Sequence, residues 1–216
     1  MENKTISTSA SFNFGWLKFK QKASLFIGIA IFITVLSSIQ QSYQLAEKDV
    51  LDGTPGLYLY ILTLLGFLIS SYLSLGVWRI MIKHSRNEEI EFSDLFRVSF
   101  KNLINYLIAN LVAGIVTLIG FIFFIVPGIH IALRLMFISA YIVDENQNFE
   151  QALKSSWAIT KGHTVKLFIW GLLATAIVIL GFLSLIFGLF IAMPIVSLAY
   201  AFLYLKLREE DIVNYH

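Results

Sequence analysis

Residues 103–143 read LINYLIANLVAGIVTLIGFIFFIVPGIHIALRLMFISAYIV, an apolar run long enough for two membrane spans and interrupted near its middle by Pro127 and Gly128. A helix needs about 20 apolar residues to cross the hydrocarbon core of a bilayer. Proline and glycine end or kink helices. The run therefore predicts two transmembrane helices joined by a tight turn, with the helix break at Pro127 and Gly128.

The other apolar runs of the chain follow the same plan. Residues 23–43 and 57–81 are each long enough for one span, and residues 165–207 form a second double-length run, interrupted between Gly188 and Pro194. Only 14% of the residues are charged against 57% hydrophobic, which is too few to coat a soluble protein of this size. We therefore expect an all-α integral membrane protein, a single transmembrane domain over residues 1–216, with six transmembrane helices as three hairpins.

The basic residues test this division, because short loops rich in Lys and Arg stay in the cytoplasm. All but two of the 16 Lys and Arg residues fall on one side of the predicted membrane. The exceptions are Lys48, in a loop on the other side, and Arg134, inside the fourth span. Both termini are therefore predicted to lie on the cytoplasmic side of the cytoplasmic (inner) membrane.

A segment before each pair of spans has apolar residues at spacings of three and four, which places them on one face of a helix. Such helices are expected to lie in the cytoplasmic interface of the membrane, with their aromatic side chains as anchors. In the third segment, Asn148 and Gln151 have the spacing of a capping box. The three stripes are Phe12, Trp16 and Phe19; Phe92, Leu95, Phe96 and Phe100; and Phe149, Leu153 and Trp157.

The order of these elements suggests a threefold repeat of one interfacial helix followed by a hairpin, over residues 9–82, 90–143 and 148–208. Gly120-Phe121 and Gly181-Phe182 stand at corresponding places in the last two copies. Hairpins in lipid share a similar composition in any case. The order of the elements is therefore stronger evidence for the repeat than the shared residues.

Four residues are candidates for binding a lipid or another ligand: Arg134, Trp157, Lys161 and His130. An ionisable residue inside a span is costly and is often functional. Two readings of Arg134 remain open. Its guanidinium could donate to backbone carbonyls freed near Pro127, or it could contact a lipid phosphate or an anionic substrate.

Several functions find no support in the sequence. The chain has no cysteine, and its four histidines are scattered, so no metal site is expected. No catalytic motif or cofactor-binding motif occurs, and the net charge of +2 is too small for nucleic-acid binding. The acidic residues, Asp94 and Asp144 among them, fall in loops and are expected on a solvated face. No residue is therefore assigned a catalytic role.

Residues 125–168 carry a family resemblance. They contain IVPG at residues 125–128, ALR at 132–134, AYIVD at 140–144, QALKSSW at 151–157 and TKG at 160–162. This segment resembles bacterial membrane-protein families that include the membrane domain attached to some glycerophosphodiester phosphodiesterases, together with stand-alone relatives. The resemblance implies the six-span fold. It implies no catalysis here, because the phosphodiesterase activity belongs to a separate soluble domain.

Two hypotheses of function follow. The first is a non-enzymatic accessory or scaffold component that docks, through its interfacial helices, on membrane lipids, another membrane protein or a cytoplasmic partner. The alternative is a carrier or binder of a lipid or small amphiphile, with an intramembrane cavity near Arg134.

Overall fold

The computed structural model describes residues 7–48, 57–184 and 188–214, and every regular element among them is helical. Five segments are long and apolar enough to cross a membrane, and a sixth is added if the bent pair α1 and α2 is one span. The prediction of a polytopic helical membrane protein is confirmed at this level. The five segments are Tyr60–Ser85, Phe100–Phe123, Ile125–Asp144, Thr164–Leu183 and Leu189–Glu209.

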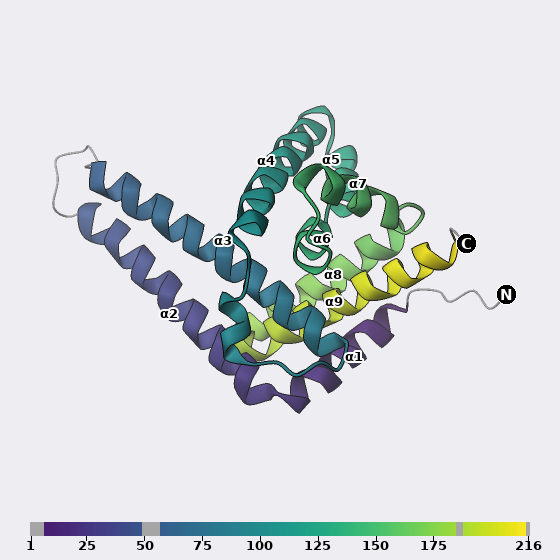
Figure 1. Ribbon diagram of the computed structural model, residues 1–216, viewed down its shortest axis with the longest axis horizontal. Coiled ribbons are helices and arrows are strands. Elements are labelled where there is room, and N and C mark those ends of the chain that lie inside the picture. The colour runs from purple at the N-terminus through teal and green to yellow at the C-terminus, as the bar shows by residue number, and fades with distance from the viewer. Residues whose placement is uncertain (1–6, 49–56, 185–187, 215–216) are drawn as a thin grey trace.

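Two long helices of the N-terminal part lie side by side and form an arm (Figure 1). Helix α1 (Thr8–Gln21) turns by 93° into α2 (Ala23–Lys48), which lies beside α3 (Leu57–Ser85). A short 3-10 helix, η1 (Phe92–Phe96), follows and packs on α3. Arg79 lies within the candidate span Tyr60–Ser85. Arg134 is therefore not the only arginine inside a candidate span, in contrast to the sequence prediction.

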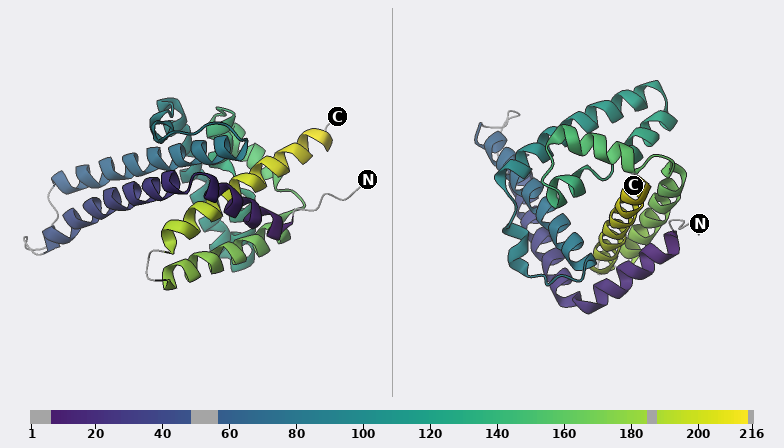
Figure 2. Two further views of the ribbon diagram at one scale, coloured as in Figure 1. Left: turned by 90° about the horizontal axis from the view of Figure 1, so that it is seen from below. Right: turned by 45° about the vertical axis from the view of Figure 1, so that its right-hand side comes forward.

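The middle and the C-terminal third complete the molecule. Helix α5 folds back along α4, and α8 lies beside α9. Helix α1 crosses α9 and packs on it along much of its length (Figure 2). The bounds are α4 Phe100–Phe123, α5 Ile125–Arg134, α6 Ile138–Asp144, α7 Phe149–Ile159, α8 Thr164–Leu183 and α9 Leu189–Asn214.

Both proline-marked breaks lie earlier in the chain than predicted. The first break falls at Phe124, and Pro127 sits in the first turn of α5. A proline is tolerated there because the first N–H groups of a helix have no intrahelical partner. Pro194 lies inside α9, whereas α8 ends at Leu183. Pro127 therefore marks the start of a returning helix, Pro194 lies in the second turn of another, and neither proline forms the turn itself.

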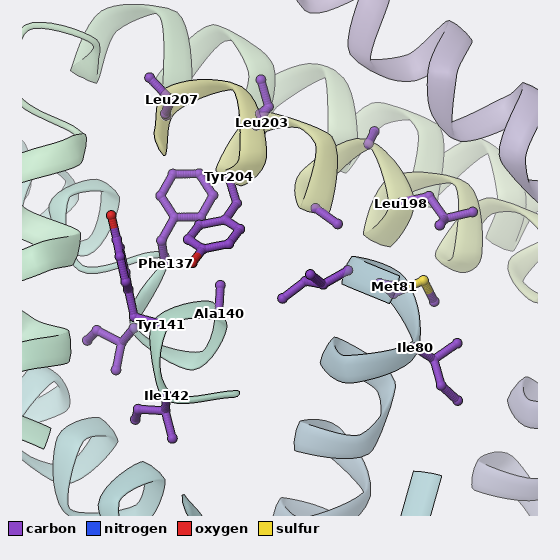
Figure 3. Close-up of a cluster of buried hydrophobic side chains, with 14 of the residues drawn as sticks. Ile80, Met81, Phe137, Ala140, Tyr141, Ile142, Leu198, Leu203, Tyr204 and Leu207 are labelled. Atoms are coloured by element: carbon purple, nitrogen blue, oxygen red, sulfur yellow. The ribbon is translucent and has the colours of Figure 1, made fainter. Parts of the chain in front are cut away.

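The main core lies where α3, α6 and α9 meet (Figure 3). Tyr204 of α9 packs edge to face on Tyr141 of α6, with ring centroids 5.2 Å apart, and Phe137 lies 6.0 Å from the Tyr204 ring. Aromatic pairs in these arrangements add about 0.5–1.5 kcal/mol beyond the burial of their area. Ile80 and Met81 bring α3 into the same cluster.

Two glycines at matching positions allow close approach of the chain in the helix pairs α4–α5 and α8–α9. A methyl group on Gly120 of α4 would lie 3.0 Å from the Cα of Gly128 on α5. A methyl group on Gly181 of α8 would lie 3.0 Å from the carbonyl oxygen of Gly188 and 2.8 Å from the Ala192 side chain. Both contacts are tighter than ordinary van der Waals packing. The glycines of the two Gly-Phe pairs thus have a common packing role, while the repeat boundaries stay a prediction.

We expect Gly120→Ala to destabilise the protein by about 1–2 kcal/mol, because the added methyl group overpacks the contact between α4 and α5. Gly114→Ala on the same helix is the control, since no atom lies within 4 Å of a methyl group there. The measurement is thermal unfolding of both variants in detergent. Equal melting temperatures for the two variants would contradict the close approach of α4 and α5.

Candidate functional site

Arg134 ends α5 and is only 6% exposed. Its guanidinium carbon lies 4.6 Å from the centroid of the Trp157 ring on α7. A cation over the face of an indole is attracted by the ring quadrupole. The structure therefore brings together two of the four residues singled out in the sequence.

The Arg134 guanidinium has no carboxylate or hydrogen-bond acceptor among the described residues, and its Nε is sealed from solvent without a partner. Buried side-chain donors in proteins are nearly always hydrogen-bonded. A buried charge without a partner costs several kcal/mol. The stacking on Trp157 offsets only part of this cost, since a cation–π contact contributes about 1–2 kcal/mol.

Hydroxyl groups of α7 satisfy the backbone at the end of α5. The carbonyl oxygen of Arg134 accepts from the Ser156 hydroxyl at 2.9 Å, and the Thr160 hydroxyl lies 3.2 Å away. The Ser156 oxygen also accepts from the backbone N–H of Phe137 at 3.1 Å. The structural reading of Arg134 concerned carbonyls freed near Pro127, one to two turns earlier in the chain. Its guanidinium donates to no backbone carbonyl among the described residues.

The other two candidate residues, His130 and Lys161, differ in their contacts with Arg134 and Trp157. His130 lies one turn before Arg134 on α5, and its exposed ring meets the edge of Trp157 at a centroid distance of 6.4 Å. Lys161 follows Thr160 in an exposed turn after α7, where its side chain makes no hydrogen bond or ion pair to the residues described. His130 therefore belongs to the cluster by contact, and Lys161 only by its position in the sequence.

The predicted anchors of α1 point in two directions. Phe12 stacks on Trp170 of α8 with ring centroids 5.4 Å apart, and Phe19 is buried. Trp16 is 43% exposed, and the Lys20 ammonium lies 5.3 Å from its ring centroid. The stripe is therefore divided between a face that packs on the protein and a face that does not.

The second and third stripes also differ from each other. Phe92 and Phe96 belong to the short η1 in place of the predicted amphipathic helix, and both meet Phe32 of α2 edge to face. The third segment is an α-helix, α7, and its predicted capping box is confirmed. Phe149, half-buried, begins this helix, and its backbone N–H donates to Asn105 Oδ1 at 3.1 Å.

Asp144 is not on a solvated face, contrary to the sequence prediction. Its side chain is 5% exposed and accepts from both terminal nitrogens of Arg86, at 2.6 and 2.7 Å. Arg208 donates to it at 2.9 Å and the Tyr204 hydroxyl at 3.0 Å. The sequence did contain a hint of this network: Asp144 follows the apolar run 103–143, and Arg86 and Arg208 each follow another apolar run.

Asp94 of η1 is the second acid that the sequence misplaced, since its side chain is 1% exposed. Burial raises the pKa of this carboxyl. The backbone N–H of Glu91 and the Lys83 ammonium, 2.9 Å away, outweigh burial and hold the pKa below its usual value. Asp94 is therefore a charged group that fixes η1 on α3.

Comparison of the chain with protein-family models, with curated proteins and with solved structures finds no match. The fold and the site thus define a helical membrane protein with a buried arginine that has no charged partner among the residues the structure describes. The likeness of residues 125–168 to membrane domains of phosphodiesterases stays a prediction.

We expect Asp144→Asn to destabilise the protein by about 2–4 kcal/mol, because it leaves Arg86 without a carboxylate and leaves Arg208 with Glu145 alone. The figure is reduced from that of a fully buried pair because both arginine side chains are about a third exposed. Glu150→Gln is the control, since its pair with Lys154 is exposed. Unfolding in detergent measures both, and a loss no larger than that of the control would contradict the role of Asp144.

Proposed function

We propose that this chain is a non-enzymatic integral membrane protein that docks on anionic lipids at the cytoplasmic membrane surface through the outward face of α1. The observation that carries the proposal is the exposed Trp16 with the Lys20 ammonium over its ring and exposed Leu17 beside it. Apolar and aromatic residues next to lysines are typical of helices that lie among lipid headgroups.

The opposite face of α1 supports the same proposal. The Trp170 indole N–H donates to the Ser11 hydroxyl at 2.9 Å, and Phe14 stacks on Phe202 of α9 with centroids 4.6 Å apart. These contacts hold α1 firmly against α8 and α9. Trp16 and Lys20 are therefore presented on a fixed surface, without the ordering cost of a free segment.

The full topology is part of the proposal. Six spans as three hairpins, with both termini in the cytoplasm, agree with the positive-inside rule. The network of Arg86, Asp144 and Arg208 supports it, because the ends of α3, α6 and α9 would then share one membrane face. In this arrangement α2 is the first span, and α1 and α7 lie in the cytoplasmic interface. Lys48 ends α2, but its side chain falls outside the described residues.

Single cysteines test the topology, because the chain has none of its own. We expect a membrane-impermeant maleimide to label Glu88→Cys in inverted vesicles and Ser184→Cys in right-side-out vesicles, since both positions are exposed and would lie on opposite faces. Labelling of both from the same side would refute the six-span topology.

A nitroxide on Leu17→Cys tests the docking. We expect its electron paramagnetic resonance signal to be relaxed by oxygen and protected from a water-soluble nickel chelate, because Leu17 would lie among headgroups. The same label on Glu88→Cys is the aqueous control. In vesicles containing anionic lipid, Lys20→Gln should increase nickel access at position 17. If positions 17 and 88 show equal nickel access, the proposal fails.

A second candidate function, the binding of a lipid or small amphiphile near Arg134, is favoured by the unpaired guanidinium beside Trp157.

A further inference from the structure

We infer that Arg134 and Trp157 form a binding site for a phosphate group carried by the headgroup of a membrane phospholipid. The site is distinct from the outward face of α1, because it lies between α5 and α7.

Charge is the first argument. The Arg134 side chain is more than nine-tenths buried and meets no carboxylate among the described residues, and its Nε has no acceptor. Arginine stays protonated in proteins, so it cannot escape this cost by losing a proton. An anion held against the two terminal nitrogens, which are not among the sealed atoms, supplies the missing charge and accepts from their N–H groups.

The other arginines of the chain provide a comparison, because most of their guanidinium groups are paired with carboxylates. Arg86, Arg97 and Arg208 each reach a carboxylate. Arg79 shares with Arg134 a sealed Nε, but it is only half-buried, and no aromatic ring stacks on it in the described part of the chain. Arg134 alone combines burial, an unpaired Nε and a stacking partner within that part.

The geometry of the pair selects the ligand. The guanidinium carbon of Arg134 lies over the Trp157 ring, 4.6 Å from its centroid, and the N–H donors of the guanidinium have no acceptor among the described residues. A phosphate accepts from a guanidinium with two parallel hydrogen bonds, which is the strongest arrangement open to arginine. The neighbouring carbonyl of Arg134 is already taken by Ser156, so the backbone does not compete for these donors.

The surroundings indicate that the phosphate comes from a lipid. Arg134 lies within the apolar segment Ile125–Asp144. Trp157 is 41% exposed and His130 is exposed, so the cluster opens at the outer surface of α5 and α7, where lipid meets the protein. Tryptophan is enriched at the headgroup level of a membrane, and an arginine near a helix end, as Arg134 is in α5, can reach that level with its long side chain.

Native mass spectrometry of protein released from phosphatidylglycerol nanodiscs tests the inference. We expect wild type to retain bound lipid and Arg134→Gln to lose about tenfold or more of it, because a charge-assisted contact of this kind contributes that much to binding. Arg97→Gln is the matched control: it removes the same charge from an exposed position and should retain lipid like wild type. Equal retention by all three proteins would overturn the site.

Melting temperatures of delipidated protein provide a second readout. Without lipid, Arg134→Met should melt at or above the wild-type temperature, because it removes an uncompensated buried charge. Added phosphatidylglycerol should raise the melting temperature of wild type and not that of the variant. A variant that melts well below wild type without lipid would make Arg134 structural and overturn the inference. Stabilisation of wild type by inorganic phosphate to the same extent would overturn the lipid source.

Trp157→Leu covers the case in which the Arg134 variants do not fold. This variant keeps the charge but removes the surface that orients it, so lipid retention should fall while Arg134 remains. Unchanged retention would overturn the part assigned to Trp157. The result is independent of docking by α1, which the nitroxide at position 17 reports separately.

Discussion

The carboxylate of Asp144 is the constraint on which the arrangement of this molecule depends. It ends α6 and accepts hydrogen bonds from Arg86, just after α3, and from Arg208 on α9. The desolvation of such a network removes much of its net contribution to stability. Its main effect is to fix the position of the helix ends, because a slip by one turn would leave a charge unpaired. The aromatic core beside it, with Phe137 and Tyr204, packs only when those ends are in place.

The segment from α5 to α6 contains two buried charged side chains, Asp144 and Arg134, whose surroundings differ. Asp144, at its end, is compensated by two arginines and a tyrosine from distant parts of the chain. Arg134, at its middle, is compensated by no charge among the described residues and only stacks on Trp157. Asp144 shows that buried charges in this fold can be paired with residues from distant segments, and Arg134 is not paired in this way among the described residues. This contrast is the reason that we propose a ligand for Arg134.

Helix α1 has two different faces, and in the proposed docking on lipid each face has its own role. Its residues at spacings of three and four divide between a face with Phe12 and Phe19, turned to the protein, and a face with Trp16 and Lys20, turned outward. A surface that docks on lipid gains from being held rigidly, since less conformational freedom is lost on binding. The packing on α8 and α9 supplies that rigidity.

The sequence by itself determined the helical membrane class, because span length is set by bilayer thickness and is readable from a run of apolar residues. It also determined local features such as the capping box of Asn148 and Gln151, whose partners are three residues apart. Only the tertiary structure decided that Asp144 is buried, because its partners lie about 60 residues away on either side. It likewise decided that hydroxyls of α7, and not the guanidinium of Arg134, satisfy the end of α5. Such contacts between distant segments leave no periodic signal in the chain.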